Sequence, residues 1–123
     1  MQASPHPAIH DRWVICLCAQ WCGACREWRA LFEQAAEAHP DLRFRWVDVE
    51  DEAAAMGDVD VETFPTLLVA DGARPLFFGP VQPSAAQLSR LLASLLREGA
   101  APSGVTAETS TLLARLLPTL LKP

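Results

Sequence analysis

The feature that most constrains this chain is a pair of cysteines, Cys22 and Cys25, set between two different hydrophobic patterns. An apolar run over residues 13–18 precedes the pair, and a helical pattern follows it. If the pair opens a helix, the unpartnered N–H groups and the positive dipole end stabilise a thiolate on the first cysteine. A thiolate attacks a disulfide and forms a mixed disulfide with it. A second thiol, one helical turn further along the chain, can then resolve this mixed disulfide. Half of a zinc site and an idle surface pair are the alternatives.

Length and composition exclude several classes of protein. With 123 residues, half of them hydrophobic, the chain is long enough for one domain with its own core. Its net charge of -5 and the lack of a basic stripe argue against a nucleic-acid partner. No stretch approaches the ~20 apolar residues that span a bilayer, so no membrane partner is expected. The start is not a convincing signal peptide, and we therefore expect a cytoplasmic location.

All four cysteines lie within residues 16–25. A disulfide scaffold spreads its cysteines along the chain to join distant loops, so this clustering favours reactive cysteines over structural disulfides. In a reducing cytoplasm the C-x-x-C pair would rest as a dithiol.

The first half of the chain predicts a strand–helix–strand unit. Residues 13–18 are apolar on both faces, as in an interior strand, with Cys16 and Cys18 on the same face. Residues 23–39 show the period of an amphipathic helix, which Pro40 ends. Residues 43–49 alternate like a strand. A helical crossover between two strands implies parallel pairing and a right-handed connection.

The next segments predict a short helix and a hairpin. The helix covers residues 51–56, with Asp51 as its N-cap and Gly57 as its stop. An apolar strand over residues 63–70 runs into Asp71-Gly72, a hairpin signal. Pro75 then places the second hairpin strand at an edge of the sheet or delays its start.

The end of the chain predicts two helices. Ser84 can cap a leucine-striped helix that ends at Gly99, and residues 100–104 have the composition of a linker. Leucine pairs then recur four apart, a helical period that Pro118 interrupts. We expect this leucine-rich segment to fold back over sheet or helix surface that would otherwise be left uncovered. A dimer contact and a groove for a partner are the alternatives.

Taken together, the order of elements resembles the thioredoxin family over residues 13–97. Two separate motifs carry the resemblance: W-C-G-A-C at residues 21–25 and F-P-T-L at residues 64–67. It implies an α/β, thioredoxin-like three-layer fold around a mixed sheet of about four strands. The family's first strand–helix unit is reduced or missing, and the C-terminal helix is extra. The expected organisation is a flexible arm (1–11), a thioredoxin-like domain (12–98), and a linker with an amphipathic helix (99–123).

The resemblance also implies roles for individual residues. Cys22 matches the exposed nucleophile and Cys25 the buried resolving thiol. Pro65 matches the cis-proline beside the pair; from the residues alone, a trans proline at a strand end is the other reading. The Phe64 backbone would pair with an extended substrate segment. The residues expected to contact substrate are Trp21, Gly23, Ala24, Phe64, Pro65, Gly79 and Pro80.

The chain departs from the family pattern around the pair. The family's buried aspartate is Cys16 here, its lysine partner is Trp46, and Cys18 occupies the place of an aromatic residue. The proline between the two cysteines is Ala24. A buried carboxylate usually accepts the proton of the resolving thiol, so its replacement puts fast turnover in doubt.

Several of these residues have more than one interpretation. Asp48 or Glu50 could stand in for the missing acid, although solvated carboxylates near a strand end are the ordinary outcome. For Cys16 and Cys18 we expect core packing rather than redox participation. A zinc site built from all four cysteines is the least favoured interpretation.

The predicted function is thiol–disulfide exchange with disulfide-bearing protein substrates, in which Cys22 and Cys25 cycle between dithiol and disulfide. The protein would act as a reductant in cell redox homeostasis. No organic cofactor or metal is needed, because electrons would come from a reductase or a dithiol donor. A thioredoxin-fold binding module with slow or regulatory redox activity is the alternative. A cysteine-rich metal carrier is a third interpretation.

Overall fold

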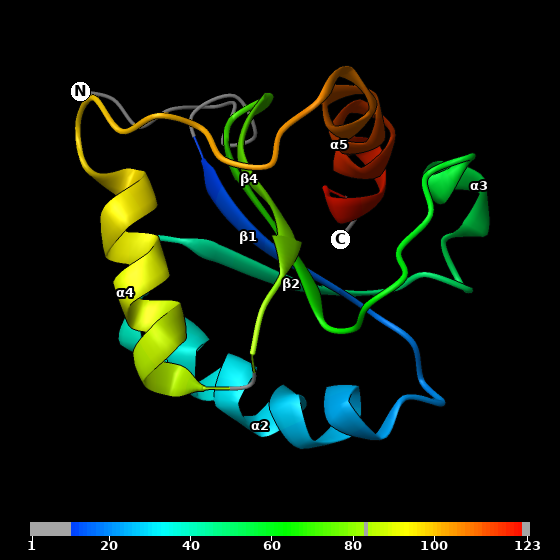
Figure 1. Ribbon diagram of the computed structural model, residues 1–123, viewed down its shortest axis with the longest axis horizontal. Coiled ribbons are helices and arrows are strands. Elements are labelled where there is room, and N and C mark those ends of the chain that lie inside the picture. Colours follow the sequence, from blue (N-terminus) through cyan, green and yellow to red (C-terminus); the bar gives the residue numbers. More distant parts are fainter. Residues whose placement is uncertain (1–10, 83, 122–123) are drawn as a thin grey trace.

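The computed structural model describes residues 11–82 and 84–121, and its centre is a mixed four-stranded sheet (Figure 1). The strands run in the order β2-β1-β3-β4. β1 pairs in parallel with β2 and antiparallel with β3, which pairs antiparallel with the edge strand β4. The strand bounds are β1 Arg12–Cys18, β2 Arg43–Asp48, β3 Thr66–Asp71 and β4 Arg74–Pro80. The expected mixed sheet of about four strands is confirmed. The predicted arm lies outside the described residues except for Asp11.

Helices cover the two faces of the sheet and make the three-layer arrangement. In Figure 1, α2 and α4 lie on one side of the strands and α5 lies on the other, with α3 near one end. The helix bounds are α2 Gly23–Ala38, α3 Ala53–Met56, α4 Ala85–Leu96 and α5 Ala107–Leu120. Within residues 11–82 and 84–121, no helix has both the length and the apolar character to cross a bilayer.

β1 divides the interior into two cores because its side chains alternate between the two faces of the sheet. Val14, Cys16 and Cys18 belong to the core under α2 and α4. Trp13, Ile15 and Leu17 belong to the core under α5. Residues 13–18 are all at most 1% exposed, as predicted for an interior strand.

The leucine-rich C-terminal segment folds back onto the sheet as the helix α5. Its leucines meet the side chains of Ile15 and Leu68 from the sheet and Met56 from α3. The leucines of α5 that are buried in this core are Leu112, Leu113, Leu116 and Leu120. Folding back was therefore the correct choice among the three alternatives.

Pro118 does not interrupt this helix, contrary to expectation. It lies inside α5, which continues to Leu120. Proline lacks an N–H, so one helical hydrogen bond is missing near the C-terminus. The helix tolerates this loss because burial against the sheet stabilises its last turn, with Leu120 only 8% exposed.

The segment before α5 is more than a linker. Ser103 forms a parallel bridge with Phe77, donates to the Leu76 carbonyl at 3.0 Å, and accepts from the Phe78 N–H at 3.2 Å. Gly104 has φ +73°, and a Cβ there would collide with the Phe78 carbonyl oxygen. These contacts fix where α5 starts.

The remaining local predictions had mixed outcomes. The Asp71-Gly72 hairpin, the edge position of the strand with Pro75, and the Ser84 cap, which accepts from the Gln87 N–H, are all observed. Asp51 is not the N-cap of α3; Glu52 holds that position. The Asp51 N–H instead donates to Asp48, in the turn after β2.

The packing of α5 leads to a stability prediction. Leu116 is fully buried, whereas Leu121 is 45% exposed. Leu116→Ala should lower the free energy of unfolding by about 2–5 kcal/mol, because it leaves a cavity against the sheet. Leu121→Ala, the matched control, should cost less than about 1 kcal/mol. Urea unfolding of the two variants measures both values, and equal midpoints would show that α5 is not part of the core.

Candidate functional site

The first cysteine of the pair lies at the start of α2. Cys22 is the N-cap residue, with extended backbone angles (φ −84°, ψ 120°), and its side chain makes no capping hydrogen bond. Its own N–H donates to the Ala19 carbonyl at 3.0 Å, and the residue is half-buried. The first amides of a helix have no partner within the helix, and this end carries the positive end of the dipole. Cys22 therefore has the predicted position at the helix start.

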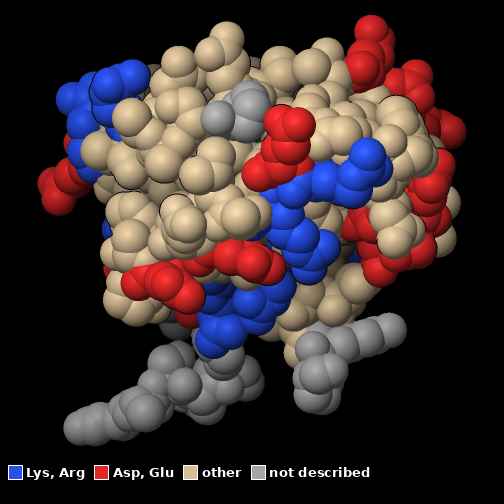
Figure 2. Space-filling view, turned by 90° about the horizontal axis from the view of Figure 1, so that it is seen from below, with Lys and Arg blue, Asp and Glu red and all other residues tan. Residues whose placement is uncertain are grey.

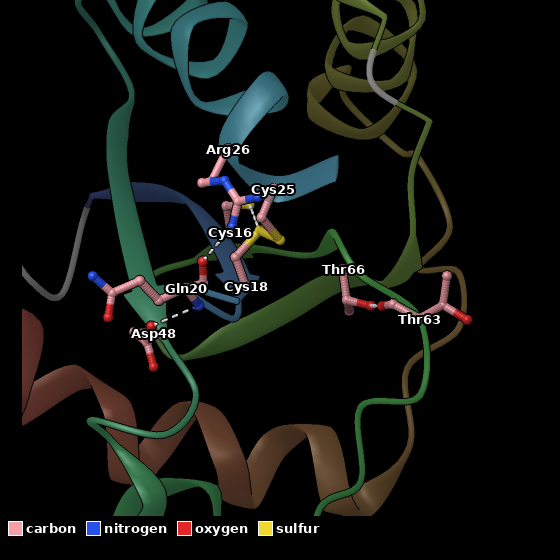
Figure 3. Close-up of a disulfide and its surroundings, with 8 residues drawn as sticks. All are labelled: Cys16, Cys18, Gln20, Cys25, Arg26, Asp48, Thr63 and Thr66. Carbon is pink, nitrogen blue, oxygen red and sulfur yellow. Dashed lines mark hydrogen bonds between the residues drawn. A yellow bond between two sulfur atoms is a disulfide. The ribbon is translucent and has the colours of Figure 1, made fainter. Parts of the chain in front are cut away.

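The second cysteine is bonded to a partner that the sequence did not identify. Cys25, 1% exposed, forms a disulfide with Cys18 at the end of β1, and the two Cα atoms are 5.9 Å apart (Figure 3). That separation is within the usual range for disulfides. In this structure Cys22 is a free thiol. The expected Cys22–Cys25 pairing is thus not the one observed. Cys18 packs in the core as expected, but it is also bonded to Cys25, which was not expected.

Cys16 lies behind this disulfide. It is fully buried, and its Sγ is 3.5 Å from the Cys18 Sγ. Burial raises the pKa of the Cys16 thiol to about 12, and the Trp28 indole N–H and the Arg29 charge oppose this rise only in part. The indole N–H has no partner in ordinary hydrogen-bond geometry, so its contact with the sulfur is weak. Cys16 is therefore a protonated thiol at neutral pH.

The position of the family's buried acid holds no carboxylate. Cys16 lies opposite Trp46 in the β1–β2 ladder, so the two replaced residues are neighbours. Asp48 does not stand in for the acid. Its carboxylate accepts from the N–H groups of Gln20 at 3.1 Å and Glu50 at 2.8 Å, which orders the surface loop before Cys22.

The two motifs meet through their aromatic residues. Trp21 and Phe64 contact each other edge to face, with ring centroids 5.7 Å apart. Trp21 is 63% exposed, and its indole N–H donates to Glu50 at 3.2 Å. The Phe64–Pro65 peptide bond is cis, the conformation that the family resemblance implies. Phe64 and Cys22 both pack against the core under α2.

The other residues expected to contact substrate are more dispersed. Gly23 and Ala24 are exposed on the first turn of α2. Gly79 lies in β4 opposite Leu67, and with Thr63 it lines a shallow depression of about 220 Å³. The structure thus brings Trp21 and Phe64 into contact, while Gly79 belongs to a neighbouring depression.

A pocket beside Cys25 was not anticipated from the sequence. It has a volume of about 480 Å³, and Cys25, Arg26 and Arg29 of α2 contribute to it together with Trp46 and Asp48 of β2. Arg26 also donates to the Gln20 carbonyl at 3.0 Å, which ties α2 to the loop before it. Figure 2 looks onto the α2 side of the molecule and shows a band of basic side chains between acidic ones. In the sequence, only the helical spacing of Arg26 and Arg29 indicated that these two side chains would lie together beside this pocket.

No set of three or more His, Cys, Asp or Glu side chains in the described part of the chain is arranged to hold a metal ion. The Cys18–Cys25 bond occupies two of the four sulfurs that the zinc interpretation required.

Comparison with known proteins decides the family. The model of the thioredoxin family matches residues 7–91. The chain belongs to the thioredoxin family. A thioredoxin of Alicyclobacillus acidocaldarius is 30% identical over 91 residues, which cover 70% of this chain and 82% of that protein. The putative thioredoxin 2 of Streptomyces coelicolor is 39% identical over 51 residues, 42% of this chain and 38% of that protein.

Solved structures agree on the fold. The Drosophila melanogaster thioredoxin Deadhead matches with a TM-score of 0.64 at 21% identity, covering 74% of this chain and 87% of that one. Oxidised mitochondrial thioredoxin 3 of Saccharomyces cerevisiae matches with a TM-score of 0.61 at 23% identity, covering 70% and 80%. Apart from the Alicyclobacillus protein, the curated relatives are matched over about half of their length or less.

The burial of Cys16 predicts a difference in thiol reactivity. With a pKa of about 12, only about one Cys16 in ten thousand is ionised at pH 8, and the thiol is also inaccessible. In the folded, fully reduced protein, iodoacetamide should modify Cys22 well before Cys16. Chymotrypsin cleavage after Leu17 and Trp21 places the two cysteines on separate peptides for mass spectrometry.

Labelling in urea is the control for this experiment, and there both cysteines should react. Equal rates of modification at Cys16 and Cys22 in the folded protein would contradict the buried site.

Proposed function

We propose that this chain exchanges disulfides with protein substrates, with Cys22 as the attacking thiol and Cys25 as the resolving one. The observation that carries the proposal is the position of Cys22, half-buried at the N-cap of α2 with no capping bond on its side chain. Thiol–disulfide exchange is the chemistry that the thioredoxin family, the fold and a disulfide-forming cysteine pair support.

The reaction has two displacements. The Cys22 thiolate attacks one sulfur of the substrate disulfide, forms a mixed disulfide, and releases the other substrate sulfur as a thiolate. Cys25 then attacks the Cys22 sulfur, which releases the second substrate sulfur and leaves a Cys22–Cys25 disulfide. Two electrons pass to the substrate, and a reductase or dithiol donor returns them. In a reducing compartment such as the cytoplasm, the net direction is reduction of the substrate.

A substrate segment has a place to bind beside Cys22. Phe64 precedes β3, and the β3–β4 ladder starts only at Thr66 and Pro80. The Phe64 main chain is therefore outside the ladder, where an extended peptide could pair with it as one added strand. The exposed Trp21 ring contacts Phe64 and adds apolar surface at the same place.

A binding module with slow redox activity is the second candidate. Two observations favour it: no carboxylate occupies the Cys16 position, and Cys25 is bonded to Cys18 instead of facing Cys22 as a free thiol. Both would slow the resolving step. The Trp21–Phe64 surface would then hold a partner without rapid turnover.

One assay separates the two candidates. With dithiothreitol as electron donor, the chain should accelerate reduction of the insulin disulfides, and Cys22→Ser should remove the acceleration. Cys16→Ala is the matched control, because it changes a buried thiol that takes no part in the steps above. Acceleration that survives Cys22→Ser would overturn the role of Cys22, and no acceleration in the parent chain would favour the binding module.

The resolving role of Cys25 has its own test. Cys25→Ala should accumulate a mixed disulfide between Cys22 and the substrate, visible by intact mass, because no thiol remains one turn on to release it. Alanine suits this buried position since it leaves no unpartnered hydroxyl. An equal absence of adduct in Cys25→Ala and the parent chain would contradict the resolving role.

A further inference from the structure

The proposed reaction does not use the sulfur of Cys18, although Cys18 has direct access to Cys25. The two residues are bonded in this structure, with Cα atoms 5.9 Å apart. Cys22 and Cys25 are three residues apart at the start of α2, so they are also neighbours on the helix surface. Cys25 therefore has two possible partners: the half-buried Cys22 on the helix, and the buried Cys18 on the strand side, to which Figure 3 shows it bonded.

We infer that Cys18 is a second disulfide partner for Cys25, and that the oxidised chain closes Cys18–Cys25 and keeps Cys22 as a free thiol. This inference rests on the proposed exchange function, because the first disulfide to form in that cycle is Cys22–Cys25. In the Cys18–Cys25 state the chain has an accessible nucleophile and no free resolving thiol.

The conversion is an internal exchange with no net oxidation. Cys18 gives its proton to water, and its thiolate attacks the Cys25 sulfur of the Cys22–Cys25 disulfide. The Cys18–Cys25 bond forms, the Cys22–Cys25 bond breaks, and Cys22 leaves as a thiolate that takes up a proton. One disulfide and one free thiol are present before and after the step.

Burial gives the second disulfide its persistence. Cys18 and Cys25 are each 1% exposed, so an external thiol has little direct access to either sulfur, although Cys25 borders the pocket next to α2. In a Cys22–Cys25 disulfide, by contrast, one of the two sulfurs belongs to Cys22, which is only half-buried. Exchange depends on access to the attacked sulfur, so reductants reach the Cys22–Cys25 disulfide more readily than the Cys18–Cys25 disulfide.

A free Cys22 beside a closed Cys18–Cys25 bond behaves as a single thiol. It attacks a disulfide such as oxidised glutathione, forms a Cys22–glutathione disulfide, and releases one glutathione thiolate. The oxidised glutathione supplies the oxidising equivalent. Cys25 cannot reverse the adduct while it is bonded to Cys18, so the oxidised chain holds a small thiol or a protein partner at Cys22.

The pairing can be measured directly, because chymotrypsin cleaves the chain between the candidate partners. The wild-type protein is oxidised with oxidised glutathione, free thiols are alkylated in acid-quenched, denatured samples, and the chain is cleaved after Leu17 and Trp21. A Cys18–Cys25 bond joins the peptide with Cys18 to the peptide that starts at Cys22. A Cys22–Cys25 bond lies wholly within the second peptide.

We expect joined peptides, with Cys22 either alkylated or carrying glutathione. In Cys18→Ala the Cys22–Cys25 bond should form instead, and the glutathione adduct on Cys22 should fall at least about tenfold. Cys16→Ala is the matched control, because it removes a buried thiol on the same strand face whose Sγ lies 3.5 Å from the Cys18 Sγ. This variant should behave like wild type. Thermal unfolding of both alanine variants checks that they fold.

Two results would overturn the inference: separate peptides with Cys22 protected in the wild-type chain, or an unchanged adduct in Cys18→Ala. Failure of the proposed function looks different. In that case neither the wild-type chain nor Cys18→Ala accelerates insulin reduction, whichever cysteines are paired. If the chains reduce insulin but the Cys18–Cys25 disulfide is absent, the proposed function stands and only the role inferred for Cys18 is wrong.

Discussion

The burial of β1 on both faces is the constraint on which the rest of the structure depends. Residues 13–18 have almost no exposure, and β2 and β3 take the hydrogen bonds of both edges of the strand. Such a strand needs a helical layer on each side. The α2–α4 layer comes from the central part of the chain, but the opposite layer depends mainly on α5, from the far end of the sequence. The leucine-rich segment is thus part of the same core that positions the cysteines.

The alternation of side chains along β1 also decides the chemistry. Cys16 and Cys18 point into the α2 side, where the strand ends and α2 begins, and this brings them close to Cys25. A carboxylate at the Cys16 position would accept a proton at neutral pH, whereas a buried thiol with a pKa of about 12 does not. Replacing the acid by sulfur removes a proton acceptor from the site. The second sulfur, at Cys18, adds a possible exchange partner in return.

The local elements could be predicted from the sequence because local patterns encode them: the apolar run of β1, the Asp71-Gly72 turn, the Ser84 cap and the helix that starts after Cys22. Contacts between distant segments were harder. The spacing of Cys16 and Cys18 indicates a shared strand face, but it does not say which helix sulfur that face meets. The pairing of Ser103 with β4 leaves no local pattern. For Pro118, the general rule against proline in helices was outweighed by burial of the last turn of α5.

The central claim is that the end of β1 and the start of α2 hold the cysteines where one reversible disulfide forms within the chain. The most direct test equilibrates the protein in glutathione buffers of graded oxidised-to-reduced ratio, quenches with acid, and counts free thiols by alkylation and intact mass. The account predicts that the monomer passes reversibly from four free thiols to an internally bonded form with two free thiols, or with one where glutathione is also bound to Cys22. Four free thiols at every ratio, or disulfides that link two chains, would contradict it.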